Sequence, residues 1–250
     1  MNRSIRLSVF AAIVVVAITS CKTTYQSQSL QYKDYRVTSS QAKDAEVLAM
    51  LKPYSDSVNK SMNEVVGVVE KSLEKKPLEG TLGNFMVDAF YTMGKEKLGK
   101  HIDAAFMNYG GIRLTQLAAG DVTRGKIFEL MPFDNVLIIQ EMKGSTLQQV
   151  LDKVAARGGW PVAGLTMQIK DKKAVNIIIQ GKPLDPNANY AVLNSDYVAN
   201  GGDDMDILKV IPQYTNGYLM RDALFDYIAK LKSQGKNISA NIENRVTNVN

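Results

Sequence analysis

A chain of 250 residues with 45% hydrophobic and 22% charged residues has the composition of a globular protein, with enough apolar material for one large domain or two small ones. Its formal net charge of +5 does not argue for binding to nucleic acid. The single cysteine, Cys21, excludes an intramolecular disulfide and any CxxC motif, and the single histidine, His101, excludes a metal centre built from several imidazoles.

The first 20 residues predict a bacterial lipoprotein signal peptide. Arg3 and Arg6 precede an apolar run over residues 7–18, which is too short to cross a bilayer as a helix, since that takes about 20 residues. The run ends on I-T-S-C, which resembles a lipobox in which Cys21 is lipidated and becomes the mature N-terminus. The alternative is an ordinary signal peptide followed by a chance cysteine.

Residues 21–40 are polar and rich in Ser, Thr and Gln, which predicts a flexible tether between the lipid and a folded domain over residues 41–250. The residues after Cys21, K-T-T-Y-Q, contain no acidic sorting run. We therefore expect a protein of the bacterial cell envelope that is anchored to a membrane by lipid and faces the periplasm.

Beyond residue 40, the hydrophobic pattern alternates between helical and strand periods. In chain order it predicts a helix over 40–62 capped by Ser40 and broken or kinked near Pro53, a strand over 64–70, a helix over 81–98, strands over 102–107 and 136–140, a helix over 145–156 ended by Gly158 and Gly159, strands over 165–169, 175–179 and 190–193, and a helix over 219–231. This order predicts one α+β (mixed α/β) domain in which helices pack on a mixed sheet.

The first of three loops of interest, N-Y-G-G-I-R over residues 108–113, follows the predicted strand 102–107. Gly110 and Gly111 let the backbone turn tightly and approach a ligand. Asn108 can donate and accept hydrogen bonds, which suits the edge of a heterocycle, and Arg113 offers a planar fork for a phosphate or a carboxylate. The alternative is a plain turn with a surface arginine.

The second loop, M-P-F-D-N over residues 131–135, contains Phe133, which is either a core residue or a platform for a ligand. The third loop, over residues 194–204, runs N-S-D-Y-V-A-N-G-G-D-D. Asp203 could bind two ribose hydroxyls, or it could cap the short helix that follows. A calcium loop built on Asp203, Asp204 and Asp206 is disfavoured, because no glutamate stands at the twelfth position.

In order and spacing, the segments N-Y-G-G-I-R, P-F-D-N and D-Y-V-A-N-G-G-D resemble the C-terminal domain of the 5'-nucleotidase family, which also contains 2',3'-cyclic phosphodiesterases and UDP-sugar hydrolases. The segments E-G-T-L-G-N-F (79–85) with Asp88, K-G-S-T-L (143–147) and G-W-P (159–161) extend the resemblance over nearly all of the folded part. The resemblance implies an α+β fold that determines nucleotide specificity.

The resemblance also implies roles for individual residues. Phe133 and Tyr197 would hold the base between their rings, as aromatic rings do in other nucleotide sites. Asn108 would contact a base nitrogen, Arg113 the phosphate or the ribose, and Asp203 the ribose hydroxyls. The full predicted substrate-binding set is Asn108, Gly110, Gly111, Arg113, Phe133, Tyr197, Gly202 and Asp203.

The sequence departs from the family pattern in the part that performs catalysis. Family enzymes carry a metallophosphoesterase domain with two metals and a G-N-H-[DE] motif, and no such run occurs here. We expect no catalytic residue, metal ligand or cofactor in this chain, and we expect divalent metals on a partner catalytic chain. Alone, the protein should bind a nucleotide without cleaving it. A further basic residue of the family corresponds to Lys75 or Lys76.

Two functions follow from this resemblance. In the first, the protein is the specificity module of a split 5'-nucleotidase and acts in nucleotide catabolism with a separate metallophosphatase subunit. In the second, it is a non-catalytic, lipid-anchored protein that binds nucleosides or nucleotides. A metallophosphatase gene beside this one would favour the first function, and a nucleoside transporter gene would favour the second.

Overall fold

The computed structural model describes residues 29, 31–36, 38 and 41–249. The predicted signal peptide, Cys21 and most of the predicted tether lie outside these residues, as does Ser40. The chain divides into two compact units, Met1–Leu48 and Ala49–Asn250. Within the described ranges, no helix has both the length and the apolar character that crossing a membrane requires.

Helix α2 (Ala45–Met62) is the first described helix, and Pro53 lies inside it. It begins five residues later than predicted, because Asp44 is its cap. The Asp44 carboxylate accepts from the backbone N–H groups of Glu46 (2.9 Å) and Val47 (3.1 Å). No side chain of α2 is buried.

A five-stranded mixed sheet lies at the centre of the second unit, in the order β12-β6-β11-β3-β7. Its strands are β3 (Ala104–Phe106), β6 (Leu137–Lys143), β7 (Val162–Ala163), β11 (Asn189–Ser195) and β12 (Gln213–Tyr214). Strand β11 runs parallel to β3 and antiparallel to β6. Successive side chains point to opposite faces, so that Ala105 and Leu193 enter one hydrophobic core while Phe106 and Val192 enter the other.

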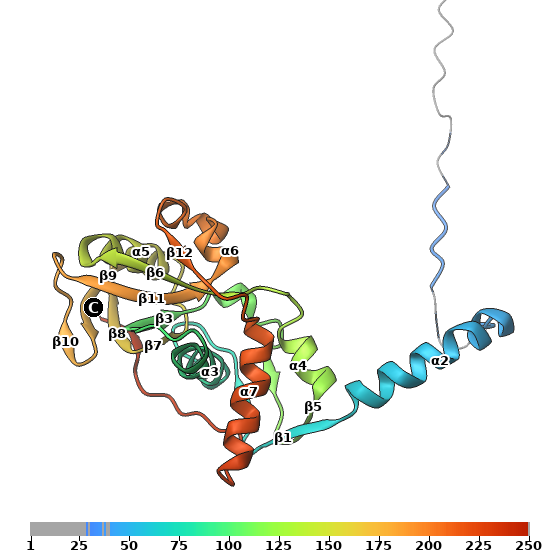
Figure 1. Ribbon diagram of the computed structural model, residues 1–250. Helices are drawn as coiled ribbons and strands as arrows, with labels where there is room; N and C mark the ends of the chain where they lie inside the picture. Colours follow the sequence, from blue (N-terminus) through green and yellow to red (C-terminus); the bar gives the residue numbers. More distant parts are fainter. Residues whose placement is uncertain (1–28, 30, 37, 39–40, 250) are drawn as a thin grey trace, which may run out of the picture. The chain divides into compact units, whose positions relative to one another are not determined.

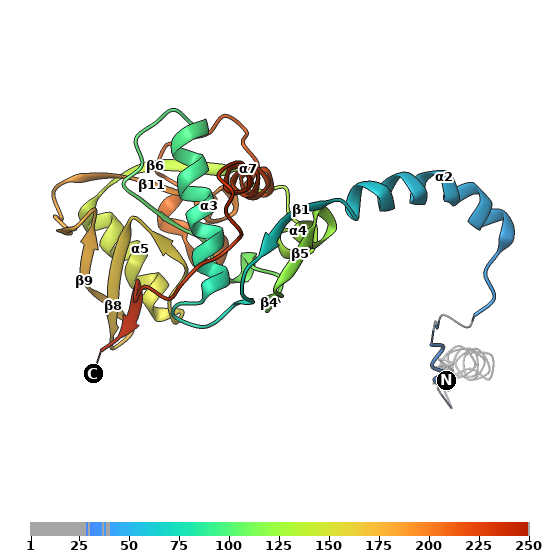
Figure 2. The same cartoon turned by 90° about the horizontal axis from the view of Figure 1, so that it is seen from below.

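Each face of the central sheet is covered by a different layer. Helices α3 (Thr81–Lys97) and α7 (Met220–Ser233) lie side by side on one face (Figures 1 and 2). Helix α5 (Gly144–Ala156) and a four-stranded sheet cover the other face. The order of that sheet is β10 (Lys182–Pro183), β9 (Lys173–Ile179), β8 (Leu165–Lys170) and β13 (Val246–Asn248). The predicted α+β fold with a mixed sheet and packed helices is therefore confirmed.

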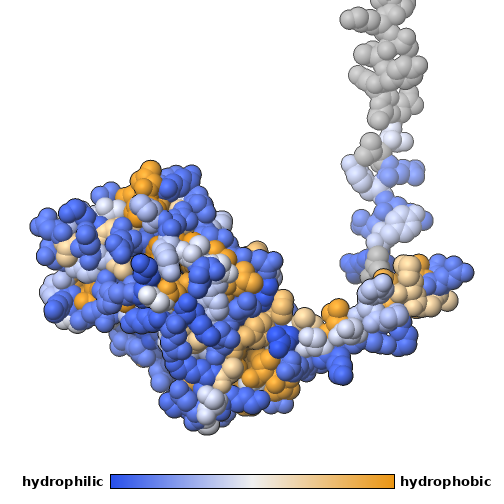
Figure 3. Space-filling view, viewed as in Figure 1, coloured by the Kyte–Doolittle hydropathy of each residue, from blue (hydrophilic) through white to orange (hydrophobic). Residues whose placement is uncertain are grey.

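Shorter elements connect these layers. Strand β1 (Val65–Val69) pairs with β5 (Gly120–Thr123), and β2 (Leu73–Glu74) pairs with β4 (Gln116–Leu117). Helix α4 (Arg124–Leu130) was not predicted; Thr123 caps it by accepting from the backbone N–H of Lys126. Apolar surface gathers around β1 and β5 (Figure 3), where Val65 and Val68 are exposed.

Candidate functional site

The strand pairing brings the three loops to one edge of the central sheet. Strands β3 and β11 are parallel, so their carboxyl ends lie at the same edge. Asn108 comes just after β3, and Asp196 directly follows β11. Strand β6 is antiparallel to β11 and pairs Leu137 with Ser195, so the loop that precedes β6 also reaches this edge.

These loops enclose a cavity of about 340 Å³, within the usual range of small-molecule pockets. The residues that line it are Asn108, Gly110, Gly111, Arg113, Phe133, Asn135, Tyr197 and Asp203. Of the predicted set, only Gly202 is absent from this lining, and Asn135 is added to it. Residues from three separate loops therefore meet around one cavity.

Two aromatic rings remain accessible at this cavity. Phe133 is 42% exposed and Tyr197 is 46% exposed, so neither ring is a core residue, and the core alternative for Phe133 is wrong. The guanidinium carbon of Arg113 lies 5.5 Å from the centroid of the Phe133 ring, a cation–π distance. Both rings can therefore offer a face to a planar ligand.

Gly202 lies against the ring of Tyr197 rather than along the cavity. A Cβ atom at Gly202 would stand 2.4 Å from Cε1 of Tyr197 and 2.5 Å from its Cζ. Any side chain at this position would therefore displace the ring. Gly201, with φ of 90°, makes the left-handed turn that precedes it. The Gly-Gly pair thus allows the loop to pass close to Tyr197.

Asn108 and Asp203 connect two of the loops directly. The Nδ2 of Asn108, a buried residue, donates to Oδ2 of Asp203 at 2.8 Å. Asp203 has φ of 54°, a left-handed conformation that costs a non-glycine residue about 1–2 kcal/mol. Asp203 lies inside the short 3₁₀ helix η2 (Gly202–Asp204), and the helix that follows, η3 (Asp206–Leu208), has Met205 as its N-cap residue and no side-chain cap. The capping alternative for Asp203 is therefore wrong, and its carboxylate faces Asn108 instead.

The next residue, Asp204, is also left-handed, with φ of 58°. Helix α5 and its C-terminal end hold it from outside the cavity: Arg157 pairs with its carboxylate, and Nζ of Lys153 donates to its carbonyl at 2.9 Å. Asp206 pairs with Lys209 at 2.6 Å. Asp204 and Asp206 are thus paired with basic side chains.

The structure separates the two lysines that the sequence left as alternatives. Nζ of Lys75 donates to the carbonyl of Ile112 at 2.8 Å and lies 4.0 Å from the ring centroid of Tyr109. Burial and the nearby charge of Arg113 lower the pKa of Lys75. Lys76 instead pairs with Glu74 at 2.6 Å. Lys75 is therefore the lysine that belongs to the loop of Arg113.

Asn135 and Asp196 connect the loop of Phe133 to the loop of Tyr197. No role was predicted for either residue from the sequence. Nδ2 of Asn135 donates to Oδ1 of Asp196 at 2.7 Å, and the same oxygen accepts from the backbone N–H of Tyr197 at 2.8 Å. One carboxylate oxygen thus contacts both the loop of Phe133 and the residue that carries the second ring.

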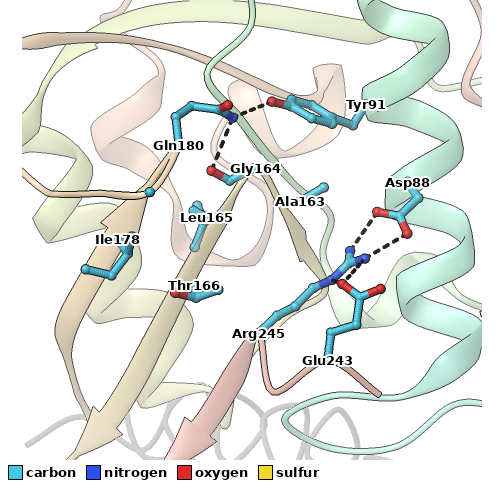
Figure 4. A pocket seen from close by; sticks show the side chains of 11 residues that line it. Asp88, Tyr91, Ala163, Gly164, Leu165, Thr166, Ile178, Gln180, Glu243 and Arg245 are labelled. Atoms are coloured by element: carbon cyan, nitrogen blue, oxygen red, sulfur yellow. Dashed lines mark hydrogen bonds and ion pairs between the residues drawn. The ribbon is translucent and has the colours of Figure 1, made fainter. Parts of the chain in front are cut away.

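The other candidate sites were a metal centre and a second, larger cavity. In the part of the chain that the structure describes, no three His, Cys, Asp or Glu residues lie together as metal ligands would. The larger cavity, of about 500 Å³, lies between α3, β8, β9 and the C-terminal segment (Figure 4). Its polar groups bind one another: Arg245 pairs with Asp88 (2.6 and 2.8 Å) and Glu243, and the amide of Gln180 donates to the hydroxyl of Tyr91.

This network gives a structural role to Glu79, in the segment over 79–85, and to Asp88. Glu79 accepts from the backbone N–H groups of Glu243 (2.8 Å) and Arg245 (3.1 Å), so the segment fastens the C-terminal residues onto α3. Burial raises the pKa of Asp88, and the hydrogen bonds from Arg245 act in the opposite direction. The charged residues around the larger cavity are therefore explained by the contacts that hold the C-terminal residues in place.

The model of the family described as 5'-nucleotidase, C-terminal domain, matches residues 64–210, which is more than half of the chain. The chain belongs to this family. Protein UshA of Yersinia enterocolitica is 32% identical over 200 residues, covering 76% of this chain and 35% of that protein. A 5'-nucleotidase of Vibrio cholerae is 28% identical over 202 residues, with the same coverage.

Solved structures agree with this membership. The 5'-nucleotidase precursor of Thermus thermophilus superposes with a TM-score of 0.69 at 25% identity, covering 81% of this chain and 43% of that one. The NAD nucleotidase of Haemophilus influenzae has the same fold, with a TM-score of 0.63 at 20% identity, covering 83% of this chain and 42% of that one. The chain spans about a third of the length of the curated relatives that it matches.

Proposed function

We propose that this domain binds the nucleoside part of a nucleotide and acts as the specificity module of a 5'-nucleotidase whose catalytic metals lie on another chain. The observation that carries the proposal is the pair of accessible rings, Phe133 and Tyr197, at a cavity that also holds the Asn108–Asp203 pair. Relatives named 5'-nucleotidase support the class of ligand.

Each part of the cavity suits a part of a nucleotide. A base stacked on the two rings gains about 1–3 kcal/mol per contact. Asn108 has free hydrogen-bonding capacity for a base edge, and the Asp203 carboxylate can accept from ribose hydroxyls. Arg113 lines the cavity, and Lys75 stands near Arg113 without lining the cavity itself. The described contacts of both cations are to carbonyls and aromatic rings. Such a pair suits a phosphate.

Hydrolysis would require groups that the described residues do not bring together, since none of their acidic, His or Cys side chains form a metal-binding cluster. We therefore assign the divalent metals to a separate metallophosphatase chain and assign nucleotide binding to this one. Lipidation of Cys21 would place the module on a membrane of the cell envelope, facing the periplasm, together with its partner. No cofactor is assigned to this chain.

The experiment that tests the proposal is calorimetric titration of the purified protein with AMP and adenosine in EDTA. We expect binding without metal, and we expect Tyr197→Ala to abolish it. A phosphate-release assay with added Mg²⁺, Mn²⁺ or Zn²⁺ follows. Metal-dependent release by the protein alone would overturn the division of labour, and absence of binding to either ligand would overturn the nucleoside site. Binding that no metallophosphatase from the same envelope converts to hydrolysis would favour the non-catalytic binding protein.

A further inference from the structure

A buried arginine lies behind the loop that carries Phe133. Arg221 stands in the first turn of α7 and is only 8% exposed. A buried guanidinium needs partners for its N–H groups, because an unpaired buried charge is costly. Arg221 does not line the cavity, so its partners rather than a ligand explain its position.

The partners of Arg221 in that loop are two backbone carbonyls and one side-chain carboxylate. Its Nη1 donates to the carbonyls of Met131 (3.3 Å) and Phe133 (3.2 Å), and its Nη2 pairs with the carboxylate of Asp134. Its guanidinium carbon lies 4.2 Å from the ring centroid of Phe128 in α4. The planar fork thus reaches two carbonyls and one carboxylate while it stacks on a ring.

The start of α7 holds the rest of the same loop. The backbone N–H of Met220 donates to the carbonyl of Asn135 at 2.8 Å. With the two bonds from Arg221, this fixes the carbonyls of alternate residues, 131, 133 and 135. The backbone N–H of Arg113 donates to the carbonyl of Leu130 at 3.1 Å, so the loop of Arg113 is fixed to the point where this loop begins.

We propose that Arg221 is a positioning residue that sets the Phe133 ring at its place in the cavity. The inference rests on the proposed function, because the purpose of the ring is to stack on a base. Without the guanidinium, the carbonyls of Met131 and Phe133 lose their donor. Met131 is buried, and leaving its carbonyl without a partner is unfavourable, so the loop rearranges and the ring leaves its position.

The test compares AMP with ribose 5-phosphate, which has no base to stack, in calorimetric or NMR titrations of the full chain. Arg221→Met should weaken AMP binding about tenfold or more, the range of one lost stacking contact. Ribose 5-phosphate binding should not change. In a Phe133→Ala background, Arg221→Met should cost nothing further. The matched control is Asp222→Asn, which alters an exposed side chain in the same turn of α7; it should bind AMP as the wild type does.

An equal loss for both ligands, or the same loss with and without the Phe133 ring, would show that Arg221 only stabilises the fold and would overturn the inference. If Arg221→Met does not fold, Arg221→Lys replaces it, because lysine keeps the charge but has no planar fork.

A measurement without ligand separates this inference from the proposed function. In protein labelled with fluorophenylalanine, the ¹⁹F resonance of Phe133, assigned with Phe133→Leu, should shift in Arg221→Met, because the ring moves away from Arg113. It should not shift in Asp222→Asn. An unchanged resonance would overturn the inference even where AMP binds. A shift in a protein that does not bind AMP would overturn only the proposed ligand.

Discussion

Asn108 and Asp203 are 95 residues apart in the chain, and their side chains, which both line the cavity, are joined by a 2.8 Å hydrogen bond. The bond uses one N–H of the amide and one oxygen of the carboxylate, so each group keeps further capacity for a ligand. The left-handed conformation of Asp203 is thereby held by a contact on the cavity side. A ligand meets the two groups already in place.

The first prediction concerns the Asp203 carboxylate. If it accepts from ribose hydroxyls, Asp203→Ala should lower the affinity for AMP about tenfold or more, the range for hydrogen bonds to a charged group. The affinity for 2',3'-dideoxy-AMP should be the same in the variant and the wild type. Asp206→Asn, at a residue paired with Lys209, is the control and should leave both affinities unchanged. Equal losses for the two ligands would contradict the ribose assignment.

The second prediction concerns the glycine beside the Tyr197 ring. In Gly202→Ala the new Cβ would overlap the ring, so the ring must move, and AMP affinity should fall nearly as far as in Tyr197→Ala. At Gly110, which lines the cavity, a Cβ would meet no protein atom nearer than Nδ2 of Asn108 at 3.6 Å. Gly110→Ala should therefore leave the Tyr197 ring in place and lower AMP affinity only through contact of the new methyl group with the ligand. Calorimetric titration with AMP measures these affinities. If Gly202→Ala bound AMP as tightly as the wild type, the position of the Tyr197 ring would not matter for binding.

The third prediction is a pH dependence caused by Lys75. Its pKa lies below the usual 10.5, because burial and Arg113 disfavour the charged form. A phosphate favours the charged form, so AMP binding is coupled to protonation of Lys75. Affinity for AMP should therefore fall as pH rises through this lowered pKa, while affinity for adenosine stays constant. Measurements should start above about pH 7.5, where the phosphate is already a dianion.

Lys75→Met should remove this dependence and weaken AMP binding, without effect on adenosine. Lys76→Met is the control, since Lys76 pairs with Glu74, and it should retain the wild-type pH profile. If the pH dependence of AMP affinity were unchanged in Lys75→Met, Lys75 would not interact with the phosphate.

The fourth prediction separates stability from binding. Arg245→Met removes the partner of Asp88, a carboxylate that is mostly buried, and should lower the free energy of unfolding by about 3 kcal/mol or more. Arg124→Met, at an exposed pair with Glu64, should cost less than about 1 kcal/mol. Urea denaturation measures both. AMP affinity of folded Arg245→Met should equal that of the wild type, and a loss would indicate that the larger cavity communicates with the ligand site.

Local signals explain why much of this structure could be predicted from the sequence. The longer helices and the strands β1, β3, β6, β8, β9 and β11 have clear hydrophobic patterns, and their ends lie within a few residues of prediction, apart from the start of α2. The other described strands have four residues or fewer and were not predicted: β2, β4, β5, β7, β10, β12 and β13. That start was misplaced because Ser40 and Asp44 are both good caps, and only the hydrogen bonds to Glu46 and Val47 distinguish them. Helix α4 has seven residues, too few to show a period.

The parts of the site that were missed depend on long-range contacts. Arg221 in an amphipathic helix has the pattern of a surface residue, and its bond to the Phe133 carbonyl spans 88 positions of the chain. The Asn135–Asp196 bond spans 61. Gly202 was predicted as a lining residue because spacing cannot show which side of the Tyr197 ring it occupies. The choice between Lys75 and Lys76 likewise required their contacts.

The parallel pairing of β3 with β11 also has a kinetic consequence. Next to it, Asp103 accepts from the backbone N–H of Ala191 across 88 residues of chain, and contacts between such distant segments form slowly. A cavity assembled by that pairing does not exist in a partly folded chain. A nucleotide that bridges these loops would therefore leave the rate of folding unchanged and slow the rate of unfolding, so that occupancy lengthens the lifetime of the native state.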